Sequence, residues 1–323
     1  MHMDIQTGVS IILNRWLGVK RDDLILLITD ETHLREAEAF ERWALGADAV
    51  LKTVMLPHGA VQNGAVIEEQ APLMKRANAI IGATDYSFIT TRAVTDAVHA
   101  GARFVSLPLS CSDGTSLLEN EFIGMDPAWT RHTGARILRV LNPAQEIRVT
   151  TQLGTDLLFR KRGRTGGCYC GQAERRGFVS SASFEVYIPI EEHETEGRLV
   201  LDGSLGYLGL VSRPVDITFS GGRLQADVYS PDGRMLMDYI ESFESGNMYY
   251  AAEFGIGLNT ISRCRGVSYI EDESTYRTFH IGLGRNITLG GVQEAAGHFD
   301  IVTHLPTITA DGTVIMKDGE VAV

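Results

Sequence analysis

The sequence predicts an α/β N-terminal domain, with a small parallel sheet and flanking helices, followed by an α+β, mainly antiparallel β, metal-binding domain. Apolar runs of strand length alternate with helix-like segments up to Asn142-Pro143, after which strands of period two and hairpin turns take over. The 323 residues also exceed the size at which one hydrophobic core usually stops growing. We therefore expect two domains, at residues 1–144 and 145–323.

Four apolar runs in the first domain have the length and composition of buried parallel strands. Polar, helix-favouring stretches separate them, and two of these stretches end on a glycine, Gly46 and Gly101. No glycine-rich phosphate-binding motif follows any of these strands, so we do not expect a nucleotide cofactor. The predicted strands are DLILLIT (23–29), AVLKTVML (49–56), NAIIGAT (78–84) and RFVSLP (103–108).

In the second domain, segments of alternating polarity predict antiparallel strands. The pairs Gly221-Gly222 and Asp311-Gly312 are strong hairpin signals. A helical segment precedes the domain at 127–141, and a helix or two is expected between 232 and 250. The strands are expected within EIRVTTQLGTDLLFRKRG (146–163, two strands), SFEVYIPI (183–190), GRLVLDGSL (197–205), VDITFSGGRLQADV (215–228) and TITADGTVIMKDGEV (307–321).

Composition argues against several classes of partner. A formal net charge of −12 disfavours nucleic acid and anionic membranes, which select for basic patches. No apolar run is long enough to cross a bilayer and no signal pattern opens the sequence, so a cytoplasmic protein is expected. Cys168-Tyr169-Cys170 could bind a metal or form a redox pair, although free thiols in a glycine-rich loop are the simpler interpretation.

Five side chains of metal-ligand type stand in segments rich in glycine and aliphatic residues. In an extended GHFDIV segment, His298 and Asp300 point to the same side. Glu253 and His280 each precede a glycine-punctuated apolar run, and Glu185 interrupts a strand that is apolar on both faces. Three carboxylates and two imidazoles suit one or two divalent ions such as Zn²⁺, Co²⁺ or Mn²⁺, and two metals sharing a carboxylate fit five ligands better. Such a pair of metals indicates hydrolysis of an amide or peptide bond. The alternative to a metal site is that His298 and Asp300 form a metal-free hydrogen-bonded pair.

Other polar residues are candidates for substrate contacts. Arg285 and Asn286 could orient a carboxylate or stabilise a developing oxyanion. Residues 85–87 and 90–92 follow the third strand, where open α/β sheets usually place functional groups. The cluster at 191–194 is as rich in ligand types, but we interpret it as a solvated turn.

These segments resemble those of the aminopeptidase T-like (thermophilic aminopeptidase) family of metallopeptidases. The resemblance rests on SFEVYIPIEEHETEGRLVLDGS, AEFGIGLN, HIGLGRN, the Gly290-Gly291 pair and HFDIV, in that order, with GTDLLF at 154–159. It implies an α/β domain followed by a β-rich catalytic domain, usually in a homodimer. It also implies two metals held by the five residues at 185, 253, 280, 298 and 300.

The sequence departs from that family at Ile287, where the resemblance implies a catalytic tyrosine. The length of the chain is nearer to that of the enzymes of a related branch, the 2,5-dihydroxypyridine dioxygenases. Those enzymes hold one Fe²⁺ through two histidines and an aspartate. That branch has a histidine at the position of Glu253 and apolar residues at those of Glu185 and His280. This chain cannot form that triad from the matching positions, although either Glu253 or His280, together with the two ligands of HFDIV, could hold one iron.

We therefore expect an enzyme, a metal-dependent hydrolase of the aminopeptidase type, with Arg285 and Glu253 as catalytic residues and two Zn, Co or Mn ions. The alternative is a mononuclear non-haem Fe(II) dioxygenase that cleaves a 2,5-dihydroxypyridine-like ring. The expected partners are a small-molecule or short-peptide substrate and a second copy of the chain.

Overall fold

The computed structural model describes residues 3–58 and 65–323. The chain forms two compact units. The first unit comprises Met1–Pro127 and Tyr169–Ala182, and the second comprises Ala128–Cys168 and Ser183–Val323. The units are therefore discontinuous in sequence, whereas the domain boundary at 144/145 is a prediction for two continuous segments. None of the helices in the described residues has the length and apolar character to cross a membrane.

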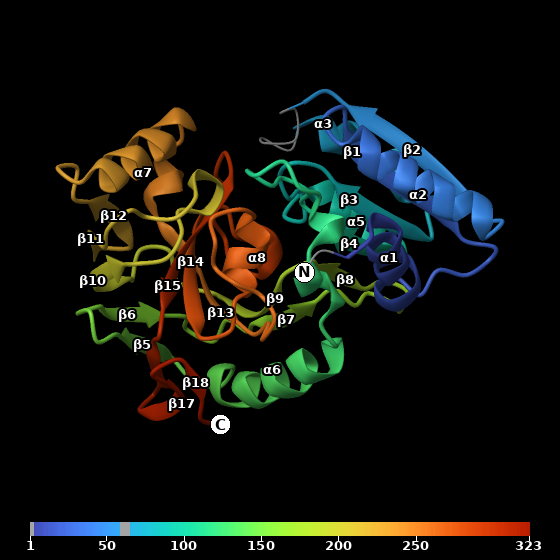
Figure 1. Ribbon diagram of the computed structural model, residues 1–323. Coiled ribbons are helices and arrows are strands. Elements are labelled where there is room, and N and C mark those ends of the chain that lie inside the picture. The colour runs from blue at the N-terminus through green and yellow to red at the C-terminus, as the bar shows by residue number, and fades with distance from the viewer. Residues whose placement is uncertain (1–2, 59–64) are drawn as a thin grey trace. The chain divides into compact units, whose positions relative to one another are not determined.

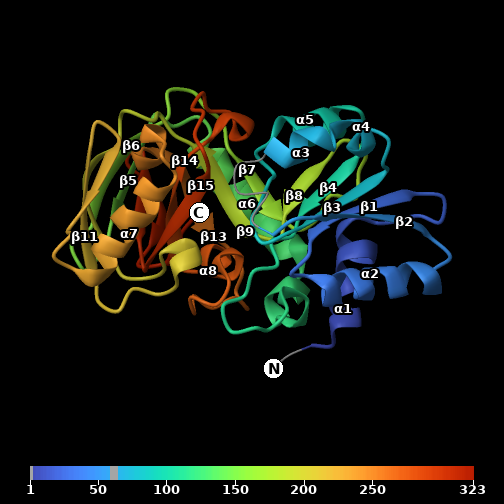
Figure 2. The same ribbon diagram turned by 90° about the horizontal axis from the view of Figure 1, so that it is seen from above.

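The first unit is a parallel sheet with helices on both faces. The strand order is β2-β1-β3-β4-β8, and each neighbouring pair is parallel. Figure 2 shows α1 and α2 on one face of this sheet and α3, α4 and α5 on the other. Its elements are α1 (Ile5–Ser10), continued by a π-helix (Ile11–Trp16), β1 (Leu24–Asp30), α2 (Leu34–Gly46), β2 (Val50–Leu56), α3 (Ala65–Glu69), α4 (Ala71–Met74), β3 (Ala79–Ala83), α5 (Arg92–His99), β4 (Arg103–Ser106) and β8 (Val179–Ser181).

The four strands predicted for the first half are confirmed as β1 to β4. The apolar runs of β1, β3 and β4 are almost wholly buried, whereas β2 lies at the edge of the sheet and is fully buried only at Leu56. Strand β8 was not predicted from the sequence. This strand is three residues long and comes from a segment beyond residue 145, yet it pairs with β4 at the edge of the parallel sheet. A strand so short has too few residues to display a period.

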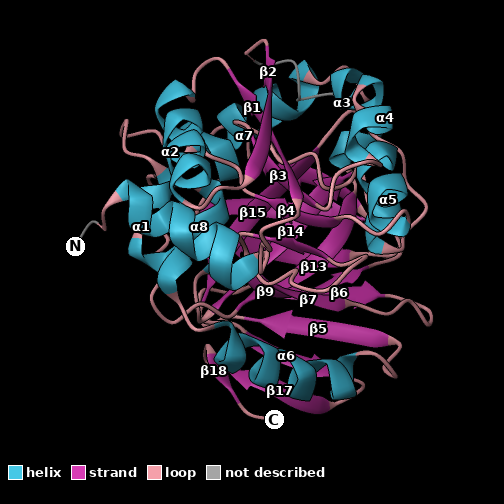
Figure 3. Ribbon diagram, turned by 90° about the vertical axis from the view of Figure 1, so that its right-hand side faces the viewer, coloured by secondary structure: helices cyan, strands magenta, loops and turns pink. Residues whose placement is uncertain are grey.

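The second unit is built mainly from strands, as the magenta arrows of Figure 3 show. An eight-stranded sheet has the order β12-β11-β10-β6-β5-β16-β17-β18, and a five-stranded sheet has the order β15-β14-β13-β9-β7. Its elements are α6 (Pro127–Leu141), β5 (Glu146–Thr150), β6 (Asp156–Arg160), β7 (Gly167–Cys170), β9 (Phe184–Pro189), β10 (Glu196–Leu201), β11 (Val215–Ser220), β12 (Arg223–Ala226), α7 (Pro231–Ser242), β13 (Ala251–Gly257), α8 (Tyr269–Ser274), β14 (Thr278–Gly284), β15 (His298–His304), β16 (Thr307–Ala310), β17 (Thr313–Lys317) and β18 (Glu320–Val321).

Turn chemistry fixes the hairpins of the larger sheet. Gly221 and Gly222 both have positive φ and connect β11 to β12, and Asp311 and Gly312 do the same between β16 and β17. Both hairpin predictions are confirmed. The expectation of a glycine-rich loop around Cys168 is wrong, because that segment forms β7, and its cysteines are free thiols.

The smaller sheet carries the five predicted metal ligands. Strands β9, β13, β14 and β15 are consecutive neighbours (Figure 1) and pair antiparallel. Strands β13 and β14 are buried along their whole length. A polar side chain on these strands is therefore shielded from water and needs a partner within the protein.

Candidate metal centre

The five predicted metal ligands lie on four neighbouring strands of the smaller sheet. Glu185 is on β9, Glu253 on β13, His280 on β14, and His298 and Asp300 are at the start of β15. His298 keeps 18 % of its side chain exposed, whereas the other four residues are buried. Because neighbouring strands face each other across one sheet, residues distant in sequence meet here.

Glycines on these strands make room for the imidazole rings. Gly255 stands opposite His280, and a Cβ atom at Gly255 would lie 1.8 Å from the Nε2 atom of that histidine. Gly282 stands opposite Asp300, and a Cβ atom there would lie 2.7 Å from Nε2 of His298. The glycines that interrupt these apolar segments are therefore required, because a larger residue would occupy the space over the sheet in which the imidazole rings lie.

Ligand atoms of these residues converge in two triads that share one carboxylate. Glu253, His298 and Asp300 form one triad, and Glu185, Glu253 and His280 form the other. Within each triad the three ligand atoms lie within 4.8 Å of one another. The structure thus brings together all five predicted ligands, with Glu253 between the two groups.

In the first triad the imidazole lies between two carboxylates. The Nε2 atom of His298 is 3.0 Å from Oε2 of Glu253 and 3.3 Å from Oδ1 of Asp300. Burial opposes a charge on His298, but the Asp300 and Glu253 carboxylates outweigh burial and raise the pKa of the ring well above its usual value. Burial raises the pKa of Glu253, whereas the His298 charge, acting against burial, lowers the pKa of Asp300. When the His298 ring is protonated, the proton on Nε2 therefore lies between the Glu253 and Asp300 carboxylates, in the space on which the three ligand atoms converge.

The second triad contains polar atoms without hydrogen-bond partners. The Nε2 atom of His280 lies 2.7 Å from Oε2 of Glu185, but the geometry is not that of a hydrogen bond. Neither that oxygen nor Nδ1 of His280 has a hydrogen-bond partner among the described residues, whereas the other Glu185 oxygen accepts from the Ser183 hydroxyl at 2.6 Å. Burial acts to lower the pKa of His280, yet the Glu185 charge outweighs it and raises this pKa to about 9.

A sixth ionisable residue, Glu273 on α8, belongs to the centre and was missed by the sequence analysis. Its carboxyl is buried next to Asp300, and one of its oxygens has no hydrogen-bond partner among the described residues. Burial first, and then the charges of Asp300 and Glu185, raises the pKa of Glu273 well above its usual value, which favours the protonated carboxyl beside Asp300. The acidic run Glu271-Asp272-Glu273 is the signal in the sequence, but such a run usually indicates a solvated helix.

The charge balance of the centre fits a divalent cation. Four carboxylates are buried with two imidazoles, and within the described residues the ion pairs of these carboxylates are all with histidine. Buried anions in excess of cations are costly unless they are protonated or bind a metal. Carboxylate oxygens and imidazole nitrogens are ligands for Fe²⁺, Zn²⁺, Co²⁺ and Mn²⁺, and the unpartnered Glu185 and His280 atoms provide further positions for such an ion.

The backbone of Arg285 fixes the His298 ring. Its carbonyl oxygen lies 2.8 Å from Nδ1 of His298, and its N–H donates to the Gly297 carbonyl at 2.8 Å. A proton on Nδ1 donated to this carbonyl leaves Nε2 free for a metal. The structure thus links Arg285 to the centre through its main chain, and the catalytic role of its guanidinium stays a prediction. The side chain of Ile287, which stands where the resemblance implies a catalytic tyrosine, is 39 % exposed.

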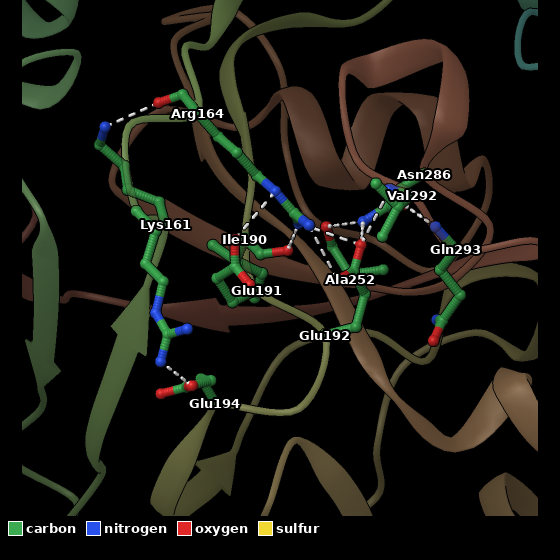
Figure 4. A network of polar contacts seen from close by, with 11 residues as sticks. Lys161, Arg164, Ile190, Glu191, Glu192, Glu194, Ala252, Asn286, Val292 and Gln293 are labelled. Carbon is green, nitrogen blue, oxygen red and sulfur yellow. Dashed lines mark hydrogen bonds and ion pairs between the residues drawn. The ribbon is translucent and has the colours of Figure 1, made fainter.

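A buried polar network holds the loop between β14 and β15 that carries Arg285 (Figure 4). Arg164 binds the Glu192 carboxylate with both terminal nitrogens, at 3.0 and 2.9 Å. Asn286 donates to the same carboxylate at 2.8 Å and to the Ala252 carbonyl at 2.9 Å, and the N–H of Val292 donates to Glu192 at 3.1 Å. This network ties the loop to the residue that precedes Glu253.

The interpretation of residues 191–194 as a solvated turn is wrong for Glu192. This side chain is buried, and although burial disfavours its charge, the hydrogen bonds from Arg164 and Asn286 lower its pKa to about 2. The sequence could not indicate this, because both partners lie far along the chain. Asn286 is likewise buried and structural, instead of facing a substrate.

The candidate residues at 85–87 and 90–92 lie in the first unit, after β3, as expected from the strand order. Their contribution to a substrate site stays a prediction.

Comparisons with known proteins agree with this architecture. Residues 19–323 match the family model described as 2,5-dihydroxypyridine 5,6-dioxygenase. Among solved structures, the 2,5-dihydroxypyridine dioxygenase of Pseudomonas putida KT2440 matches with a TM-score of 0.81 at 14% identity, over 99% of this chain and 98% of that chain. Wild-type AmpT from Thermus thermophilus matches with a TM-score of 0.68 at 14% identity, over 99% of both chains. No match was found among curated protein sequences.

The glycine spacing leads to a first prediction. In Gly282→Ala the new methyl group meets the His298 ring and the Glu253 Cβ, so we expect the affinity for a divalent metal to fall by about 10-fold or more with the fold retained. Equilibrium dialysis with metal analysis measures this change. Gly246→Ala is the matched control, since no atom lies within 4 Å of its added Cβ. Equal metal affinity in both variants would contradict the packing argument.

The depressed pKa of Glu192 leads to a second prediction. Its pKa lies near 4.5 in the unfolded chain and at about 2 in the folded chain, so its contribution to stability is present above pH 4.5 and is lost as the pH falls from 4.5 towards 2. We expect Glu192→Gln to lower the free energy of unfolding at pH 7 by up to about 3 kcal/mol, and the difference from wild type to shrink over that range. Urea unfolding at a series of pH values measures it.

The control for this experiment is Glu194→Gln in the same loop. Glu194 pairs with the half-exposed Arg160 and the exposed Arg162, so its loss should cost less than about 1 kcal/mol. A Glu192→Gln variant whose stability difference does not change between pH 7 and pH 3 would show that the charge of Glu192 is not what holds the loop.

Proposed function

The chain belongs to the 2,5-dihydroxypyridine 5,6-dioxygenase family, and we propose that it is a metal-dependent dioxygenase that opens the ring of a hydroxylated pyridine or a closely related heteroaromatic compound. The observation that carries this proposal is the convergence of Glu253, His298 and Asp300 in a chain that matches this family along nearly its whole length. Two of these residues form the H-x-D pair at the start of β15.

Glu253, His298 and Asp300 would hold one divalent iron through one imidazole and two carboxylates. When bound, such an iron supplies open coordination positions for dioxygen and a hydroxylated ring. The protein residues would orient the ligands: the Arg285 carbonyl would hold the His298 tautomer, and Glu273, whose raised pKa favours its protonated form, would donate a hydrogen bond to Asp300. The buried strands around the triad exclude bulk water, which strengthens these electrostatic interactions.

A second candidate function, hydrolysis of a small amide or peptide by two metals, is favoured by one specific observation. The second triad shares Glu253 with the first, as expected for two metal ions bridged by a carboxylate. In this reaction Glu253 would link the metals, and the guanidinium of Arg285 would stabilise an oxyanion in place of the tyrosine that Ile287 replaces.

The homodimer and the cytoplasmic location stay predictions.

One variant separates the two functions, because Glu185 belongs only to the second triad. The dioxygenase proposal predicts about one iron per chain and oxygen uptake with 2,5-dihydroxypyridine, both retained in Glu185→Gln and both lost in Asp300→Asn, the latter by about 100-fold or more. Metal analysis of protein purified without added metal and an oxygen electrode measure this.

The outcome that would overturn the proposal is equally concrete. Two Zn, Co or Mn ions per chain that are both lost in Glu253→Ala, together with anaerobic cleavage of leucyl-p-nitroanilide that Glu185→Gln abolishes, would establish the hydrolase instead.

A further inference from the structure

A second group of ligand-type side chains lies in the first unit, at the carboxyl ends of two neighbouring parallel strands. Asp30 is the last residue of β1, Asp85 follows β3, and His33 immediately precedes α2. Ligand atoms of these three residues lie within 4.8 Å of one another. This edge of an open α/β sheet is where functional groups usually gather.

Asp85 lies between two imidazoles. Its Oδ1 atom is 2.7 Å from Nε2 of His33, and its Oδ2 atom is 2.9 Å from Nδ1 of His58. The Oδ2 atom of Asp30 lies 3.9 Å from the same His33 nitrogen. Ligand atoms around a tetrahedral Zn²⁺ stand about 3.3 Å apart, given zinc–ligand distances near 2.0–2.1 Å, and the three separations here bracket that value.

The backbone holds Asp30 in place before any ion binds. One of its oxygens accepts from the N–H of Thr32 at 3.1 Å and from the Thr32 hydroxyl, and the other accepts from the N–H of Asp85 at 2.9 Å. The two strand ends are thus joined through one carboxylate, and little rearrangement is needed to use its remaining lone pairs for a metal.

The charge of this group is unbalanced. Three carboxylates, Asp30, Glu36 and Asp85, keep between 2 and 13 % of their side chains exposed. Among the described residues their ion-pair partners are the histidines His33 and His58, with no lysine or arginine.

From this geometry we infer that the first unit contains a second metal site of its own, for a divalent ion of the Zn²⁺ class. Asp30, His33 and Asp85 are its ligands, and His58 orients the Asp85 carboxylate through Nδ1, 2.9 Å from Oδ2. A metal here joins segments from β1, the start of α2 and β3. The inference does not depend on the proposed dioxygenase function, because the centre of the second unit uses none of these residues.

The test uses the 323-residue chain, stripped of metal and titrated with Zn²⁺, with the second unit's centre disabled by Glu253→Ala and His298→Ala, because Glu253 belongs to both of its triads. In this background we expect about one Zn²⁺ to bind per chain and to raise the melting temperature. Adding His33→Ala should abolish both effects. Adding His99→Ala, an exposed histidine in the same unit, should leave both unchanged.

Two further measurements keep the test decisive if His33→Ala fails to fold. His58 is 57 % exposed, so His58→Ala should fold normally, yet it should weaken Zn²⁺ binding by about 10-fold or more. Co²⁺ bound in the same background should give the strong visible absorption of a tetrahedral site, and Asp85→Asn should remove it.

No bound Zn²⁺ in the disabled background, or binding that is unchanged by both His33→Ala and His58→Ala, would overturn the inference. The group would then be a hydrogen-bonded network closed by protons.

Discussion

The second unit is organised around one electrostatic constraint, the burial of four carboxylates with two imidazoles on neighbouring strands. Such a group needs compensating charge, so the surrounding residues are those that allow ligands to approach each other. Gly255 and Gly282 leave space over the sheet for the two rings. The Arg285 carbonyl and the Glu273 carboxyl orient His298 and Asp300. The apolar strands around them provide the rigid support that holds ligands at fixed separations.

The parts of this arrangement that follow from local pattern could be predicted from the sequence. Glu185 and His280 stand out because they are single ionisable residues in otherwise apolar, strand-like segments, and such residues are buried only with partners. Glu273 and Glu192 could not be recognised in this way, because each lies in an acidic run that resembles a solvated surface. Their burial depends on Asp300 and on Arg164, which the fold brings to them from distant parts of the chain.

The same distinction applies to the fold. The parallel strands β1 to β4 were predictable, since an apolar run between helix-like segments has few other structures available. The assignment of residues 169–182 to the first unit was not, because a three-residue strand adds little stability on its own and pairs only where the edge of β4 is available. Sequence therefore identifies elements with their own period, whereas tertiary contacts decide where the shortest elements go.

The identity of residue 253 connects ligand chemistry to reaction class. An imidazole that binds one metal has a single nitrogen to offer, since its other nitrogen faces away and usually donates a hydrogen bond. A carboxylate has two oxygens and can bind two ions at once. Glu253 belongs to both triads, so the chain has the ligands for a second metal that a histidine at this position would not support. Within a family described as dioxygenases, the two oxygens of Glu253 therefore allow the centre to bind either one metal ion or two, and the number bound decides which reaction it can support.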